Sequence, residues 1–140
     1  MQQQISVITL GVEDLARSRR FYERGFEWTS IFENEEIIFF QMNGFVLGLW
    51  LKTSLEADAG TRPATGGGAF TMAHNVPERS DVQRVMGRLS RAGGTITRAP
   101  DQPPQGGFRG YVADPDGHSW EIAWNPAWPI DENGHVTFGL

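Results

Sequence analysis

The chain has 140 residues, of which 39% are hydrophobic and 21% charged, and a chain of this length can bury the core of one domain. It contains no cysteine, which excludes disulfides, thiolate zinc sites and a cysteine nucleophile. The net charge of −5 argues against nucleic acid or an anionic membrane as a partner. No apolar run approaches the roughly 20 residues that span a bilayer, and no signal segment precedes the first strand. We therefore expect a cytoplasmic protein.

The first half of the chain reads as one strand, one helix and three further strands. Residues 5–12 alternate, with Ile8, Leu10 and Val12 on one side. Asp14 can cap a helix that Gly25 would end. Three strand-like runs follow, at residues 28–33, 36–42 and 45–52. Asn43-Gly44 between the last two is a hairpin signal.

The same order of elements then repeats after a stretch of linker composition at residues 53–67. Residues 69–76 predict a strand, and Ser80 with Gln83 forms a capping box for a helix that Gly93-Gly94 ends. Three more strands are predicted at residues 95–99, 108–114 and 119–124. The segment after them predicts an extended tail.

The repeat predicts one α+β domain over residues 1–140, built from two βαβββ modules, because neither half can bury its sheet alone. Module 1 covers residues 1–52, the linker 53–67, module 2 residues 68–126 and the tail 127–140. We expect the modules to pair into a curved eight-stranded mixed sheet, with helices on the convex face and a cavity on the concave face. Two unrelated α+β halves are the alternative.

Two motifs resemble those of the vicinal oxygen chelate superfamily, which includes glyoxalase I, bleomycin resistance proteins and extradiol dioxygenases. Val12-Glu13-Asp14-Leu15, Ser18 and Phe21-Tyr22 are similar to its first-helix signature, and Asp114-Pro115-Asp116-Gly117-His118 with Glu121 to its second-half signature. The ending Trp120–Pro126 resembles a bacterial glyoxalase-like subgroup. The resemblance covers nearly the whole chain and implies the glyoxalase-like fold.

The resemblance also implies a divalent metal held by one ligand from each of four strands. The four positions are Val7, Gly48, Phe70 and Glu121 here, and only Glu121 can bind a metal. One carboxylate is too few, because transition metals need several nitrogen or oxygen donors. We therefore predict no cofactor and do not expect a divalent metal.

Strand alternation predicts a concave face lined by aromatic and a few polar side chains. The candidate ligand-binding residues are Phe39, Trp50, Phe70, Met72, His74, Arg109, Tyr111 and Glu121. Such a lining suits a flat aromatic or amphipathic, partly cationic molecule, with Glu121 as the counter-charge. This composition is similar to the drug-binding mode of bleomycin resistance proteins, and we expect a small-molecule binding protein rather than an enzyme.

Several alternatives remain open. The chain can be an enzyme, a lyase, isomerase or dioxygenase, either with an unusual metal site or with Glu121 and His74 as acid and base. It can also be a structural or partner-binding domain whose cavity is filled by Trp50 and Phe70, and Glu121 can be hydrogen-bonded to Tyr111 or to a backbone amide. His118 is interpreted as structural. In each case a homodimer is expected, because such modules pair within or between chains.

Overall fold

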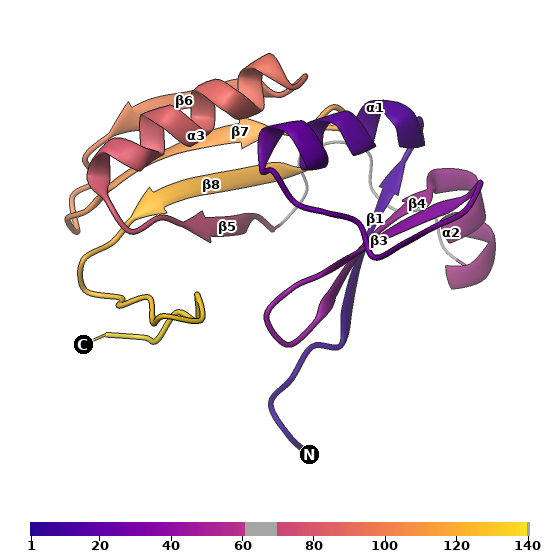
Figure 1. Cartoon of the computed structure of the whole chain (residues 1–140), viewed down its shortest axis with the longest axis horizontal. Helices are drawn as coiled ribbons and strands as arrows, with labels where there is room; N and C mark the ends of the chain where they lie inside the picture. The colour runs from indigo at the N-terminus through magenta and orange to yellow at the C-terminus, as the bar shows by residue number, and fades with distance from the viewer. Residues whose placement is uncertain (61–69, 140) are drawn as a thin grey trace.

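The computed structural model describes residues 1–60 and 70–139, and its eight strands form two four-stranded sheets. The first sheet contains β1 (Val7–Val12), β2 (Phe32–Glu33), β3 (Ile37–Gln41) and β4 (Val46–Leu51), in the order β1-β4-β3-β2. The second contains β5 (Met72–Asn75), β6 (Thr95–Asp101), β7 (Phe108–Ala113) and β8 (Ser119–Trp124), in the order β5-β8-β7-β6. Each module therefore has the same topology, and the predicted α+β fold class is confirmed (Figure 1).

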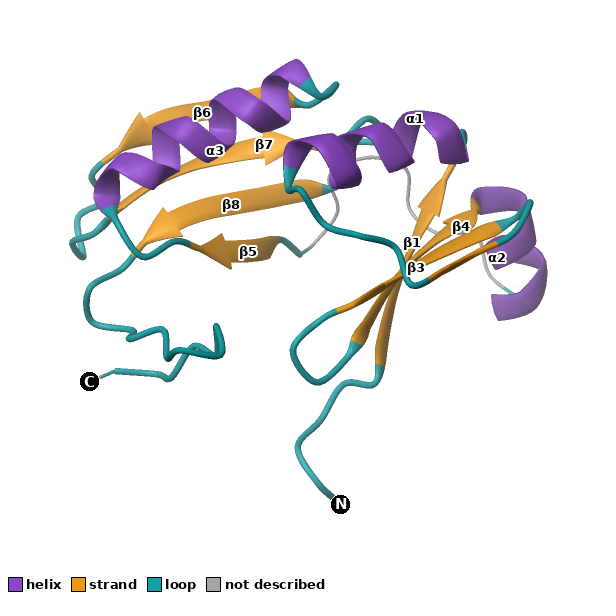
Figure 2. Cartoon of the chain, in the orientation of Figure 1, coloured by secondary structure: helices purple, strands orange, loops and turns teal. Residues whose placement is uncertain are grey.

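The helices follow the repeat, with one addition (Figure 2). Helix α1 (Leu15–Arg20) continues into the π-helical segment η1 (Phe21–Gly25), and α3 (Arg79–Arg91) occupies the equivalent place in module 2. Asp14 caps α1 as predicted, its carboxylate accepting the Arg17 N–H at 2.9 Å. None of the helices among the described residues has the length and apolar character needed to cross a membrane.

The predicted capping box of α3 is wrong by two residues. Glu78 is the N-cap, with an extended backbone, and the Asp81 carboxylate accepts the Glu78 N–H at 3.3 Å. The helix thus starts before Ser80, which lies inside its first turn.

The predicted linker is also partly wrong, because its first half is the helix α2 (Lys52–Ala59). The helix ends at Gly60, which adopts a left-handed backbone conformation (φ 71°). Glycine adopts this conformation without strain because it has no Cβ. Leu55 packs against β1, where a Cβ on Gly11 would lie 3.3 Å from Leu55 Cδ2. The rest of the predicted linker, residues 61–67, lies outside the described residues. So do residues 68 and 69, with which the predicted module 2 and its predicted first strand begin.

The strand predicted at residues 28–33 is reduced to β2, because the chain before it joins the core. Glu27 has a positive φ of 62°, which turns the backbone after Phe26. Trp28 then stacks on Phe26, with ring centroids 4.2 Å apart and planes 13° apart. Burial of two aromatic rings outweighs the strand propensity of this run.

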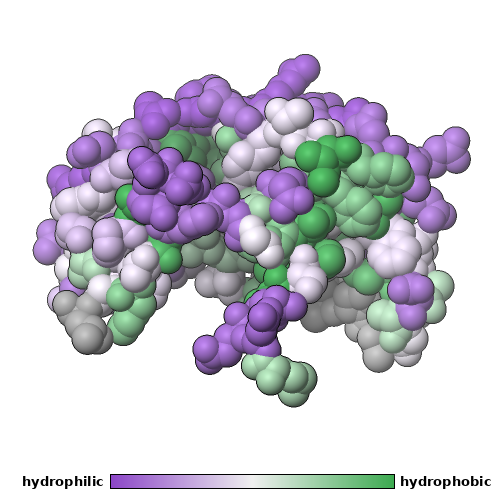
Figure 3. All heavy atoms as spheres, turned by 60° about the horizontal axis from the view of Figure 1, so that its bottom comes forward, coloured by the Kyte–Doolittle hydropathy of each residue, from purple (hydrophilic) through white to green (hydrophobic). Residues whose placement is uncertain are grey.

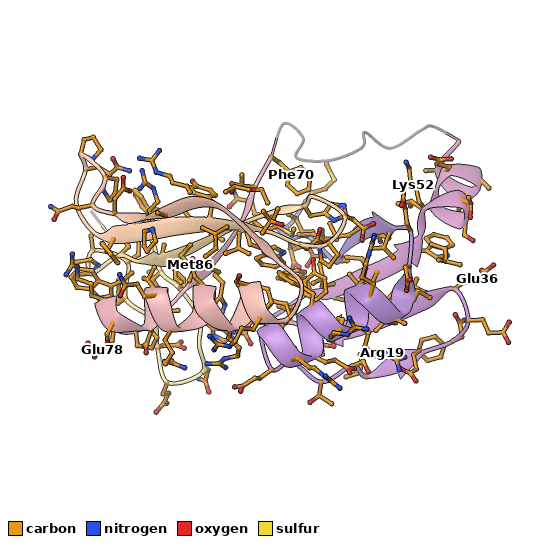
Figure 4. All side chains as sticks on the ribbon, turned by 90° about the horizontal axis from the view of Figure 1, so that it is seen from above. Arg19, Glu36, Lys52, Phe70, Glu78 and Met86 are labelled. Atoms are coloured by element: carbon orange, nitrogen blue, oxygen red, sulfur yellow. The ribbon has the colours of Figure 1, made fainter. Side chains whose placement is uncertain are left out.

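One hydrophobic core joins the two modules through their helices. Figure 4 shows α1 and α3 along the same side of the molecule. Where η1 crosses α3, a Cβ on Gly25 would lie 2.8 Å from Leu89 Cδ2, so glycine permits the close approach. In the part of the chain that the structure describes, no strand of the first sheet is hydrogen-bonded to the second. The single eight-stranded sheet that we expected is therefore two sheets held together by helix packing.

Two carboxylates of the β7–β8 turn bind module 2 to the first helix. Asp116 accepts the backbone N–H of Glu13 at 3.0 Å, the Arg17 guanidinium at 2.9 Å and the Ser18 hydroxyl at 3.0 Å. These three donors come from the start of module 1, about 100 residues earlier in the chain. The helix motif and the turn motif therefore contact each other. We call the two aspartates that make this contact, Asp114 and Asp116, the aspartate latch.

Asp114 is the buried half of the aspartate latch. Its carboxylate accepts the Tyr22 hydroxyl at 2.7 Å and faces the His118 ring, whose Nδ1 lies 2.9 Å from Oδ2. The Trp120 indole N–H donates to the Tyr22 oxygen at 3.2 Å. Burial, followed by the neighbouring Asp114 charge, raises the pKa of Tyr22, so the phenol stays protonated and remains a donor. His118 has the structural role that we predicted.

We expect Tyr22→Phe to lower the free energy of unfolding by about 1.5–3 kcal/mol, because the buried Asp114 carboxylate loses a donor. Urea unfolding measures this change. Tyr111 is the only other tyrosine and also donates to a carboxylate, but its side chain is more exposed, so Tyr111→Phe is a matched control expected to cost less. Equal losses in the two variants would show that the aspartate latch contributes no more than an exposed hydrogen bond.

We expect the stability contributed by His118 to fall as the pH rises from 6.5 through the raised pKa of this residue. Burial lowers the pKa of His118, but the hydrogen bond and charge of Asp114 outweigh it and raise the pKa above 6.5. Protonated His118 therefore stabilises the fold fully below pH 6.5, and this contribution is lost as the pH rises through the folded-state pKa. The difference in unfolding free energy between wild type and His118→Gln should shrink with rising pH, and a difference that grows would contradict the pairing.

Candidate functional site

The uncovered face of the first sheet carries aromatic side chains, as the strand alternation predicts. Thr9, Gly48, Phe39 and Phe32 form one cross-strand row, and Trp50 lies in the next row. The alternate residues of β4, Leu47 and Leu49, are buried on the helix-covered side. Phe32 and Phe39 lie with their ring centroids 5.8 Å apart. The structure therefore places Phe39 and Trp50, two of the predicted binding residues, on the same face of the first sheet.

The equivalent face of the second sheet carries polar side chains. One cross-strand row contains Ala73, Glu121, Tyr111 and Arg98 from four neighbouring strands. The Tyr111 hydroxyl donates to the Glu121 carboxylate at 2.6 Å. This hydrogen bond, followed by partial burial, raises the pKa of Tyr111, so its phenol stays protonated at neutral pH and donates the hydrogen bond. Of the two partners considered for Glu121 within the protein, Tyr111 or a backbone amide, the structure has Tyr111.

An arginine pair completes this polar face. In the next row Arg109 of β7 is paired with Asp101 of β6, and both Arg109 and Arg98 donate to the Asp101 carboxylate. We name Arg98, Asp101, Arg109, Tyr111 and Glu121 the second-sheet polar cluster. Sequence analysis found Arg109, Tyr111 and Glu121 but missed Arg98 and Asp101, because β6 has register shifts between Ile96 and Asp101 that break simple alternation.

The predicted face of β5 is wrong. His74 is paired with buried Ile122, on the face opposite to Glu121, and its ring lies against Phe26 (5.4 Å) and Trp28 (6.1 Å). Burial lowers the pKa of His74, which keeps the ring neutral. His74 is therefore part of the aromatic core, and the structure does not bring it together with Glu121 as an acid–base pair.

The same correction applies to Met72 and Phe70, which the alternation had placed on the face of Glu121. Met72 packs against the hydrophobic core, and Phe70 precedes β5 with 58% of its surface exposed. Counting back from the buried Val76 gives the correct side, because Val76 is the equivalent of buried Val12. That count moves the predicted fifth-strand metal position from Phe70 to Thr71.

The residues at the four family positions do not fit a metal ion. A Cβ built on Gly48 would lie 3.1 Å from the Phe39 ring and 3.6 Å from the Thr9 hydroxyl, so the Phe39 ring covers the place where a ligand side chain would start. Val7 has no donor, and Thr71 offers only a hydroxyl. Among residues 1–60 and 70–139, no group of three or more His, Cys, Asp or Glu side chains could hold a metal. Glu121 is the one family ligand position with a carboxylate.

One end of the first-sheet face is covered by α2, which sequence analysis missed. Leu55 and Lys52 lie over Gly11 of β1, with the Leu55 Cδ2 at 3.3 Å and the Lys52 Cγ at 3.7 Å from a Cβ built there. Gly11 is paired with Trp50, so α2 reaches the end of the strand row that carries this ring. The helix thus limits the aromatic face on one side.

Comparison with known proteins agrees with this fold. The Glyoxalase/Bleomycin resistance protein/Dioxygenase superfamily model matches residues 4–122. A glyoxalase-related enzyme from Fulvimarina pelagi is 54% identical over 99% of this chain and 100% of its own, with a TM-score of 0.96. A lactoylglutathione lyase from Agrobacterium tumefaciens is 18% identical over 89% of this chain and 95% of its own, with a TM-score of 0.70. A fosfomycin resistance protein from Listeria monocytogenes is 22% identical over the same shares, with a TM-score of 0.70.

We expect chelator-treated protein to show no rise in melting temperature with Ni²⁺, Co²⁺, Zn²⁺, Mn²⁺ or Fe²⁺, because Phe39 covers Gly48 and three positions lack ligands. Tight binding would be visible, since a ligand at 100 times its Kd stabilises the fold by about 2.7 kcal/mol. A thermal-shift series measures the effect. A rise with one ion that disappears in Glu121→Ala would overturn the prediction.

Proposed function

Because the chain belongs to the glyoxalase/bleomycin resistance protein/dioxygenase superfamily, we propose that it is a cytoplasmic, metal-free protein that binds a small aromatic or amphipathic molecule. The molecule lies on the sheet faces that the helices leave uncovered, where aromatic residues of the first sheet and polar residues of the second are available.

The observation that carries this proposal is the position of the Phe39 ring over Gly48. In the family pattern that place belongs to a metal ligand, and here it holds an aromatic surface continuous with Phe32. Half-buried Trp50 lies in the adjoining row. Aromatic rings bind flat apolar molecules by stacking and by burial of area, which requires no metal.

The hydropathy of the molecular surface differs between the two modules in the same way as the two sheet faces do. Seen from below, strongly apolar side chains gather on the first module, whereas the side formed by the second module and the C-terminal tail is more hydrophilic (Figure 3). A ligand with an apolar body and a polar end matches the combination of these two surfaces.

We also propose that two copies of the chain form a homodimer. Val7 and Phe32 on the first sheet have 48% and 50% of their surface exposed, and β1 and β5 each lie at one edge of their sheet. Large apolar side chains on uncovered sheet faces favour association. The internal repeat lets a second copy place its own second sheet against the first sheet of its partner.

A second candidate function, an acid–base enzyme, is favoured by the hydrogen bond from Tyr111 to Glu121. In this reaction Glu121 would accept a proton from the substrate, and Tyr111 would hold the carboxylate in position. His74, the other residue we had considered, lies on the opposite face. The protein from Fulvimarina pelagi, 54% identical, is described as a glyoxalase-related enzyme, which also supports this candidate.

The binding proposal is tested with N-phenylnaphthylamine, a neutral aromatic probe whose fluorescence rises in an apolar site. We expect wild type to bind it, and Trp50→Ala to weaken binding about tenfold because a stacking surface is lost. Trp50→Phe keeps a ring and is expected to restore most of the affinity. Circular dichroism and melting temperature control for folding.

Absence of probe binding by folded wild type, or equal binding by Trp50→Ala, would overturn the proposed site. Light scattering of the same samples measures the mass, which we expect to be twice the 15.6 kDa of one chain. A mass of one chain at micromolar concentration would overturn the homodimer.

A further inference from the structure

We propose that the molecule bound by this protein carries an anionic group, such as a carboxylate, sulfonate or phosphonate, which the guanidinium groups of Arg109 and Arg98 bind beside Glu121. This inference rests on the proposed function and adds the charge of the ligand.

The two guanidinium groups lie on the same uncovered face as Tyr111 and Glu121. Arg98 is paired with Tyr111 across β6 and β7, and Arg109 occupies the same side of β7 two residues before Tyr111. Both charges act on the Tyr111 hydroxyl, and each lowers its pKa although the net shift is upward. The arginines therefore stand next to the only family ligand position that retains a carboxylate.

The donors of the arginine pair are only partly used within the described residues. Arg98 donates through Nε and Nη2 to Asp101, and Arg109 donates through Nη1 to the same carboxylate. A guanidinium has five N–H donors, so a single shared carboxylate leaves several of them available for another acceptor. Guanidinium groups bind carboxylate, sulfonate and phosphonate oxygens through paired N–H donors.

The carboxylates of the cluster already have donors of their own. Asp101 is shared between the two arginines, and Glu121 accepts the short hydrogen bond from Tyr111. One of the acceptor sites of Glu121 is therefore already used within the protein. The N–H donors of Arg98 and Arg109 that Asp101 does not use match an anion.

Arg109 also differs from an ordinary surface arginine. Only 15% of its side chain is exposed, whereas Arg84, which pairs with Asp81 on α3, is 59% exposed. A guanidinium that is largely buried and has few acceptors gains more free energy from a new anionic partner than an exposed guanidinium does. The pair Arg84–Asp81 thus provides a control that has the same chemistry on a different element of the fold.

The test compares two probes with the same ring system. Anilinonaphthalenesulfonate carries a sulfonate, and N-phenylnaphthylamine lacks it. We expect the folded wild type to bind the sulfonate at least about tenfold more tightly, and Arg109→Gln to remove about tenfold of that affinity while changing the affinity for the neutral probe less than about twofold. Arg84→Gln is expected to leave both affinities unchanged. Added NaCl should weaken only the sulfonate.

The failures of the two proposals are distinguishable. If neither probe binds, the proposed function itself is overturned. If both bind equally and Arg109→Gln changes neither, the binding function stands and the anionic group is overturned. A naphthylmethylammonium cation that binds more tightly than the sulfonate, with its advantage lost in Glu121→Gln, would also overturn the inference in favour of a cationic ligand.

Discussion

The aspartate latch is the constraint on which the relation between the two modules depends. Asp116 binds three donors at the start of the first helix, and buried Asp114 holds the Tyr22 hydroxyl. A buried carboxylate is costly unless it is fully hydrogen-bonded, and each charge-assisted bond contributes about 1.5–3 kcal/mol. The turn motif of module 2 and the helix motif of module 1 therefore require each other, since either one alone would leave charged or polar groups without partners.

This latch also determines which sheet faces remain free. With α1 and η1 fixed between the modules, Phe26 and Trp28 fill the space against Trp120, and the same core takes in His74. The faces of both sheets that point toward the helices are buried in the hydrophobic core. The faces left for a ligand are those of Phe39 and Trp50 on one sheet and of Tyr111 and Glu121 on the other. The way the core is built thus leaves the uncovered faces as the place of the proposed site.

Sequence alternation predicted these faces where a strand is regular and has a buried row to count from. In β3, β4, β7 and β8 it placed Phe39, Trp50, Tyr111 and Glu121 on the uncovered side. It failed in β5, which has four residues and was counted from Phe70 instead of from the buried Val76. It failed for Arg98 and Asp101 because a register shift in β6 separates them, and local alternation contains no information about such a shift.

The carboxylate of Glu121 shows why a family position does not by itself define a chemistry. A carboxylate on the eighth strand is a metal ligand only if the facing strands supply further donors, and here Phe39 lies over Gly48 instead. The same carboxylate accepts a phenolic hydrogen bond and shares its face with two guanidinium groups. Its carboxylate thus already takes part in a hydrogen bond within the protein. The uncovered faces carry an aromatic surface on one sheet and spare guanidinium donors on the other, which is the combination that our proposed ligand, with an apolar body and a negatively charged end, would need.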